Sequence, residues 1–179
     1  MSPRIPYVPP DLPQIADLVA TIRARRGGTL LHLDRMLLHS PPLAAGWDGF
    51  LKAVRGDLLL DTRLRELAIC AVAALNGAEY EFHQHAPEFL KAGGTPAQLD
   101  ALRDPLHAVS DVALFTDALR VALQLTIEMT RAVQVSESTF AALQPHLDQR
   151  RMVELVGVIA AYNMVSRFLV ALGVEPERS

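Results

Sequence analysis

This sequence is poor in cysteine and has no excess of positive charge. Its 179 residues include one cysteine, Cys70, so no intramolecular disulfide can form. That usage fits a reducing compartment, and we expect the cytoplasm. The formal net charge is −3, from 17 basic and 20 acidic residues. Such a balance offers no surplus of cations for phosphates or anionic lipid, so neither nucleic acid nor a membrane surface is expected as a partner.

Long apolar runs are also absent. The richest stretch, Leu155 to Val165, is shorter than the roughly 20 residues of a membrane span and is followed by Arg167. The segment Met1 to Pro13 contains five prolines and lacks the apolar core of a signal peptide. We expect residues 1–13 to form an extended proline-rich arm, and residues 14–179 to form one helical domain.

Alanine and leucine are abundant, and 50% of the residues are hydrophobic. Both residues favour packed helices, and the apolar surplus beyond one small domain predicts a homo-oligomer: a dimer, trimer or hexamer. Apolar side chains recur at spacings of three and four, and no run alternates as a strand does. The predicted fold class is all-α, a single-domain bundle of about seven to nine helices.

Start and stop signals set the expected helix bounds. Asp61 or Thr62 caps the most regular helix, and Asn76-Gly77 ends it. Pro87 removes one backbone hydrogen bond inside the next helix. The expected helices lie roughly at 15–26, 29–39, 43–55, 62–76, 78–92, from 95 onward, 115–132, 136–147 and 150–172.

Glu66 and His85 are the first candidates for chemistry. If the two central helices fold back as a hairpin, Glu66 lies about 16 Å and His85 about 13 Å from the turn, at roughly 1.5 Å per residue. Their side chains can therefore meet. Glu81 lies four residues before His85 on the same helical face, so a second carboxylate can join the pair. Such a group can relay a proton, because burial and mutual charge shift each pKa.

Other interpretations of these residues stay open. A glutamate and a histidine on packed helices can form a structural pair or point apart into solvent. Metal ligation by Glu66, Glu81 and His85 is chemically admissible, although we predict no metal site. The cluster Arg23 to Arg26 is interpreted as a solvated helix end.

The segment from Arg63 to Gly94 reads RLRELAICAVAALNGAEYEFHQHAPEFLKAGG. It resembles the central segment of the carboxymuconolactone decarboxylase and alkylhydroperoxidase D family. Pro41-Pro42-Leu43 and the stretch from Ala160 to Arg167 resemble the longer, decarboxylase-like members, so the resemblance covers most of the chain. It implies an alkylhydroperoxidase D-like helical bundle that assembles as an oligomer.

In the peroxidase branch of that family, a glutamate precedes a Cys-x-x-Cys-x-x-x-His motif by twelve residues. Glu66 and His85 match the glutamate and the histidine at the same spacings, whereas Ala78 and Glu81 occupy the two cysteine positions. The departure removes the peroxidatic thiolate and its resolving partner. Cys70, inside an apolar helix, is interpreted as a core residue.

The resemblance implies a cofactor-free carboxy-lyase. Glu66 and His85 would handle a proton as CO₂ leaves a small cyclic or lactone carboxylate, which is the expected small-molecule partner. Among the residues themselves, Tyr80 is a candidate to contribute its hydroxyl to the pocket, with a place in the core as the alternative. Asn163 and Arg167 are candidates to bind a substrate carboxylate, with a subunit contact of the last long helix as the alternative. The alternatives are an alkylhydroperoxidase-like antioxidant with peroxiredoxin-type activity, and a non-catalytic oligomer that binds small acids.

Overall fold

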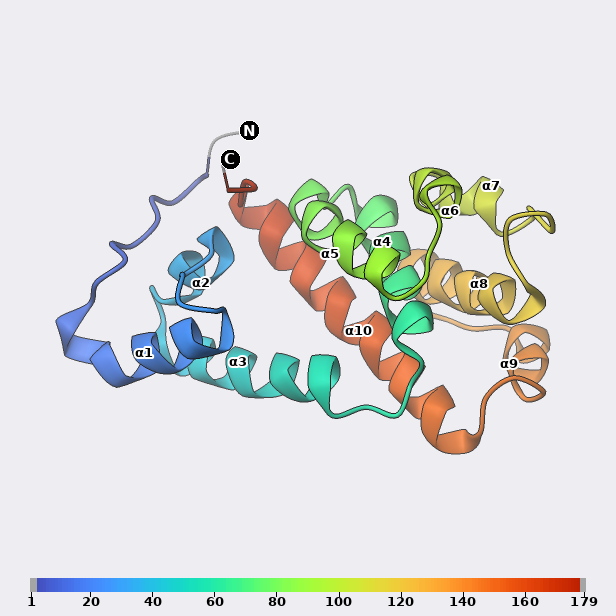
Figure 1. The fold of residues 1–179 in the computed structure, drawn as a ribbon, viewed down its shortest axis with the longest axis horizontal. Helices are drawn as coiled ribbons and strands as arrows, with labels where there is room; N and C mark the ends of the chain where they lie inside the picture. Colours follow the sequence, from blue (N-terminus) through green and yellow to red (C-terminus); the bar gives the residue numbers. More distant parts are fainter. Residues whose placement is uncertain (1–2, 178–179) are drawn as a thin grey trace.

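The computed structural model describes residues 3–177, and all the regular structure in that range is helical (Figure 1). The all-α prediction is therefore confirmed. A short 3₁₀ helix, η1 (Pro13–Ile15), precedes ten α-helices. They are α1 (Ala16–Arg25), α2 (His32–Leu37), α3 (Pro41–Gly56), α4 (Thr62–Asn76), α5 (Glu79–Lys91), α6 (Pro96–Ala101), α7 (Pro105–Ala108), α8 (Asp117–Ala132), α9 (Glu137–Leu143) and α10 (Gln149–Leu172).

Helix α4 is the centre of the fold. The Asp61 side chain accepts from the backbone N–H of Leu64 at the start, and Gly77 ends the helix with a left-handed φ of 65°. Almost every residue from Leu64 to Ala73 is buried, because α5, α8 and α10 all pack against α4. The short connection after Gly77 turns α5 back along α4, as the hairpin prediction requires.

Helix α10 runs diagonally between the α1–α3 part and the α4–α9 part of the molecule (Figure 1). Asp148 caps it by accepting from the backbone N–H of Arg151. It packs against α3, α4, α5 and α8. Among the described residues it is the one helix with the length and hydropathy of a membrane span, and half of its most apolar window is buried inside the protein.

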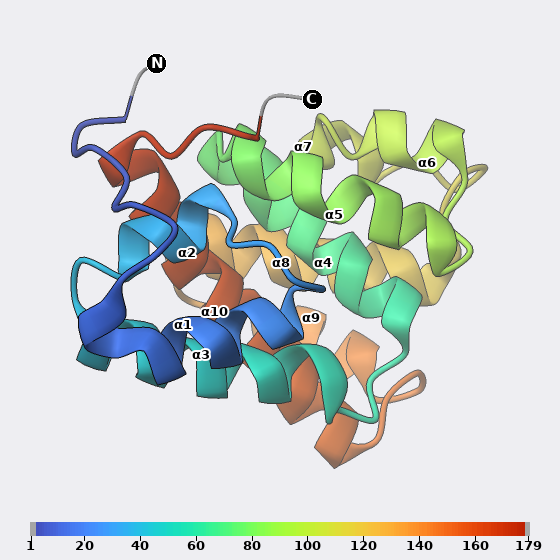
Figure 2. The same ribbon diagram turned by 60° about the vertical axis from the view of Figure 1, so that its left-hand side comes forward.

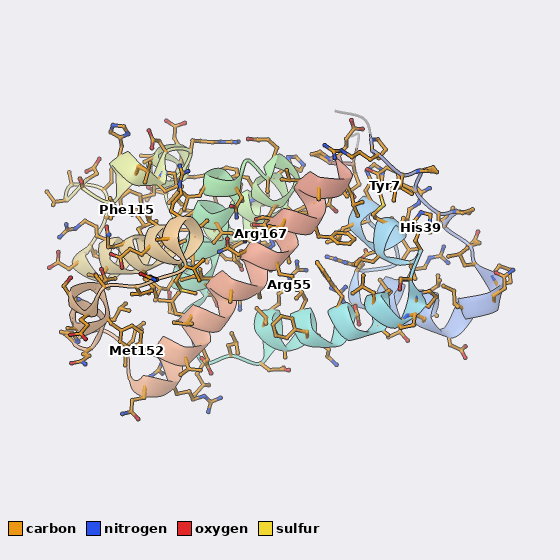
Figure 3. All side chains as sticks on the ribbon, turned by 180° about the vertical axis from the view of Figure 1, so that it is seen from behind. Tyr7, His39, Arg55, Phe115, Met152 and Arg167 are labelled. Atoms are coloured by element: carbon orange, nitrogen blue, oxygen red, sulfur yellow. The ribbon has the colours of Figure 1, made fainter. Side chains whose placement is uncertain are left out.

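The proline-rich residues before η1 run along the body of the same chain. The backbone N–H of Arg4 donates to the carbonyl of Leu172 at 2.9 Å, and the Tyr7 ring stacks on His32 with centroids 4.3 Å apart. Tyr7 accordingly lies beside the C-terminal end of α10 (Figure 3). Of the expected arm and domain, residues 1–2 and 178–179 lie outside the described residues.

The expected count of seven to nine helices was too low, and some expected bounds were displaced. The single turn of α7, between Asp104 and Val109, was not predicted from the sequence. Asp104 caps this turn and Pro105 opens it, although the segment is too short to show a hydrophobic period. Proline also opens α3, which begins at Pro41 because the first helical position needs no backbone donor.

Candidate functional site

The α4–α5 hairpin brings Glu66 and His85 into direct contact. Glu66 Oε2 lies 2.6 Å from His85 Nδ1. Both residues are buried, with 2% and 7% of their surfaces exposed. The predicted meeting of these two side chains is confirmed, because their distances from the turn are nearly equal.

Burial, hydrogen bonding and a neighbouring cation together set the charge states of Glu66 and His85. Burial would raise the pKa of Glu66, but the bond from His85 and the ion pair with Arg65, 3.0 Å away, hold that pKa below its ordinary value. Burial lowers the pKa of His85, and the hydrogen bond to Glu66 only partly offsets this. At neutral pH we therefore assign an ionised Glu66 and a neutral His85. The N–H at Nδ1 of His85 donates a hydrogen bond to the Glu66 carboxylate. The lone pair of His85 is then on Nε2, for which residues 3–177 provide no hydrogen-bond partner.

A cavity of about 370 Å³ opens beside this pair. Its wall combines cationic, acidic, amide and phenolic side chains with a few apolar ones. The lining residues are Arg26, Leu31, Leu33, Arg55, Arg65, Glu66, Tyr80, Gln84, His85, Glu88 and Val165. Three arginines around one small cavity indicate a site for an anionic ligand.

Arg55 differs from the other two arginines in its partners. Arg26 pairs with Asp34 at 3.0 Å and Arg65 pairs with Glu66, whereas Arg55 Nε donates to the Tyr162 hydroxyl at 2.8 Å. Within residues 3–177 no carboxylate forms an ion pair with Arg55, which lies between α3 and α10 (Figure 3). Burial opposes its charge, yet the Tyr162 hydroxyl and the Glu66 carboxylate hold the pKa of Arg55 above its ordinary value. Its cation thus remains available to a ligand.

Glu81 was expected to join the Glu66–His85 pair, but it does not line the cavity. Its Oε1 accepts from the Ser166 hydroxyl at 2.8 Å, and its buried Oε2 has no partner among the described residues. Burial raises the pKa of Glu81 well above its ordinary value, against the opposing effects of Ser166 and Arg55. Burial therefore favours the protonated, neutral form of this side chain. Within the described part of the chain, no three His, Cys, Asp or Glu side chains gather as a metal site.

The remaining predicted site residues separate into two groups. Tyr80 lines the cavity as expected. Asn163 and Arg167 do not line it: Asn163 bonds to Asn76 and Thr130, and Arg167 bonds back to Asn163. Successive residues point about 100° apart on a helix, so Val165 faces the cavity while Asn163 faces α4 and α8. The expected carboxylate contact to this pair does not arise in this cavity.

Sequence reasoning missed the cationic part of the site. The Arg23 to Arg26 cluster is not simply a solvated helix end, because Arg26 is 13% exposed at its side chain and lines the cavity. Arg65 had a local signal, since it directly precedes Glu66. Arg55 and Gln84 had none, because only tertiary packing shows that they face the same space.

Part of the chain matches a known protein family. Residues 41–124, which include the α4–α5 hairpin, match the family model described as "Carboxymuconolactone decarboxylase family". The central segment of the chain therefore carries the sequence pattern of this family. A comparison with curated proteins finds no match.

Solved structures share the fold of this protein. An uncharacterized peroxidase-related protein from Silicibacter sp. TM1040 has 19% identity and a TM-score of 0.81, over 99% of this chain and 95% of that chain. An alkylhydroperoxidase AhpD core protein from Ralstonia eutropha JMP134 has 20% identity and a TM-score of 0.81, over 98% and 92%. A variant of the debrominase Bmp8 in complex with 2,3,4-tribromopyrrole has 17% identity and a TM-score of 0.77, over 97% and 91%. At these identities the likeness shows the fold alone.

The cysteine of this protein lies in the core. Cys70 is 0% exposed, and burial, followed by the nearby Glu66 and Glu81, raises the pKa of its thiol. A thiol without a thiolate form is a poor nucleophile toward peroxide. The two positions that carry cysteines in the resembling peroxidases are Ala78, buried at the N-terminus of α5, and Glu81.

Replacing Cys70 by alanine is therefore expected to leave peroxide consumption unchanged. A coupled assay with a dithiol reductant measures this for the wild type and the variant. In the native wild type, the thiol should react with a thiol-specific reagent only as fast as the protein unfolds. A rate of peroxide consumption that disappears with Cys70 would restore the peroxidase hypothesis.

Proposed function

We propose that this protein is a carboxy-lyase that removes CO₂ from a small cyclic or lactone carboxylate. One observation carries the proposal: Arg55, a guanidinium with no carboxylate partner in residues 3–177, faces the cavity that also holds Glu66 and His85. A bound anion would complete its hydrogen bonding. The match of residues 41–124 to the carboxymuconolactone decarboxylase family model supports the reaction class.

The arginines have a defined task in such a reaction. Breaking the bond between carbon and CO₂ leaves an electron pair, which a conjugated carbonyl of the substrate takes up as an enolate oxygen. Arg55 serves this step best by contacting that oxygen, because a cation on the departing carboxylate would stabilise the ground state instead. Glu66 and His85 are buried beside the cavity, and a low local dielectric around them strengthens such an interaction.

His85 then supplies the proton that the reaction consumes. Its resting Nε2 first takes up a proton from the solvent, as hydronium, and the ionised Glu66 at Nδ1 stabilises the resulting imidazolium. Nε2 next donates this proton to the carbon from which CO₂ departed, and His85 returns to its neutral form. The balance is one carboxylate and one proton converted to one C–H bond and CO₂, with no oxidant or reductant.

The size of the cavity is consistent with a single small ring. Its 370 Å³ lies at the low end of ligand pockets. One protein of the same fold was crystallised with a substituted pyrrole, which shows that the fold accommodates a ligand of this size in that relative. We also propose that the protein works as a homo-oligomer in the cytoplasm, without a bound cofactor.

The test is CO₂ release from a panel of carboxylactones, measured for the wild type and Arg55→Gln. Loss of a charged hydrogen bond is worth about 1.5 to 3 kcal/mol, so kcat/KM should fall about 10- to 100-fold. Arg131→Gln, an exposed arginine in the last turn of α8, is the matched control and should match the wild type. A folded wild type that releases no CO₂ from any member of the panel would rule out the proposed reaction.

A further inference from the structure

The C-terminal tail, residues 173–177, crosses from the end of α10 to α5. Gly173 ends α10 with a left-handed φ of 64°, and the side chain of the next residue, Val174, is buried. Figure 2 shows this segment passing from α10 across the molecule toward α5. The backbone N–H of Glu175 donates to the Tyr7 hydroxyl at 3.0 Å, and its carbonyl accepts from His32 Nδ1 at 2.8 Å. Several specific contacts therefore determine the course of the tail.

Glu177 brings a carboxylate to the face of α5. Its Oε1 accepts from the Tyr80 hydroxyl at 3.2 Å and from the backbone N–H of His32 at 2.7 Å, and its Oε2 accepts from Gln84 Nε2 at 2.7 Å. No lysine, arginine or histidine side chain within residues 3–177 forms an ion pair with this carboxylate. Of the described residues, those that bond to this carboxylate are all neutral donors.

Two of these donors also belong to the cavity wall. Tyr80 and Gln84 are four residues apart on α5, so they share one helical face, and both line the cavity together with His85. Glu177 itself is not among the lining residues of the described chain. A phenolic hydroxyl and a side-chain amide that hold a carboxylate from one side can bind a ligand carboxylate in the same way.

We propose that Tyr80 and Gln84 form a carboxylate-binding subsite of the cavity, which Glu177 fills in the free protein as a built-in competitor. The inference rests on the proposed function in one respect, namely that the ligand is a carboxylate that enters this cavity. The subsite is uncharged and lies on α5, whereas Arg55 comes from α3. A ligand carboxylate gains the Tyr80 and Gln84 donors when Glu177 releases them.

Competition of this kind weakens ligand binding by a calculable factor. If the tail occupies the donors about ten times more often than it leaves them, the apparent Kd of a ligand that needs them is about tenfold higher. Removing the Glu177 carboxylate should remove that factor. Removing the Tyr80 hydroxyl should then reduce the affinity that has been gained, because the ligand loses one of its donors.

The experiment titrates succinate into the full chain and measures Kd by calorimetry, without turnover. Glu177→Ala is expected to bind succinate about tenfold more tightly than the wild type. Glu177→Gln keeps the side-chain length and should show a smaller gain in the same direction. Glu79→Ala removes an exposed carboxylate from the first turn of α5, where it pairs with Arg103, and should leave Kd unchanged. Adding Tyr80→Phe to Glu177→Ala should reverse most of the gain.

Unchanged or weaker succinate binding by both Glu177 variants, with native melting points, would overturn the subsite. Absence of succinate binding by every protein would overturn it as well. Failure of the proposed function looks different: CO₂ release is then absent, while the dependence of Kd on Glu177 and Tyr80 persists. A Kd that depends on Arg55 but on neither Glu177 nor Tyr80 would remove the subsite and retain the cationic pocket.

Discussion

Replacing His85 by asparagine is expected to lower turnover by about 10² to 10⁴, the usual contribution of a positioned acid or base. Asparagine keeps a polar group near Glu66 but cannot take up a proton and donate it to the substrate, as Nε2 of the imidazole does. Glu66→Gln should cause a loss of similar size, because a neutral amide no longer stabilises an imidazolium. The measurement is kcat for CO₂ release from the best carboxylactone of the panel. The double variant should lose little more than either single variant, since both groups serve one proton path.

The surface of the same protein provides a matched control. His107 Nδ1 lies 2.6 Å from Asp104 Oδ2, the same separation as in the Glu66–His85 pair, but its side chain is 90% exposed. His107→Asn should therefore leave both turnover and the melting temperature unchanged.

A purely structural Glu66–His85 pair would give a different pattern. Cutting one partner would leave a buried polar group unpaired, at a cost of about 1 to 3 kcal/mol of folding stability. Lowered melting temperatures with turnover intact would show that the pair only holds α4 to α5. That result would move the proton chemistry to other residues of the cavity.

Glu81→Gln is expected to stabilise the protein more as the pH rises. Burial keeps the pKa of folded Glu81 well above its ordinary value, whereas the carboxyl in the unfolded chain titrates near a pKa of about 4.3. A group with a raised folded pKa contributes its stability below the unfolded pKa, and this is lost as the pH rises toward the folded pKa. The unfolding free energy of the wild type should thus fall, relative to the variant, by up to about 1.4 kcal/mol per pH unit above this point.

Denaturant unfolding of both proteins between pH 4 and pH 8 measures this difference directly. Glutamine has nearly the shape of the protonated acid and does not titrate, so the two proteins should be most alike near pH 4. The lowered pKa of Glu66 acts in the opposite direction, but it is common to both proteins and cancels in the difference. Glu88→Gln, an exposed carboxylate on the same helix, is the control and should show no such trend. A pH-independent difference for Glu81→Gln would mean that this carboxyl is ionised in the fold.

Local sequence determined the helices and one contact of the site. The period of apolar residues from Leu64 to Leu75, with Asp61 before it and Gly77 after it, predicted the bounds of α4 because both signals act within a few residues. The same short hairpin made the Glu66–His85 contact predictable, since a reversal of direction places positions at equal distance from the turn next to each other.

Tertiary structure alone decided what surrounds that contact. Arg55 enters the cavity because α3 packs against α10, where the Tyr162 hydroxyl orients its guanidinium. Glu177 reaches Gln84 across 93 positions of sequence. Glu81 shares a helical face with His85, yet its carboxyl group is buried in the core, where it accepts a hydrogen bond from Ser166 of α10. Sequence periodicity shows which side of a helix is buried, but the partner on that side depends on how distant helices pack, and that partner decides whether a polar residue serves the core or the site.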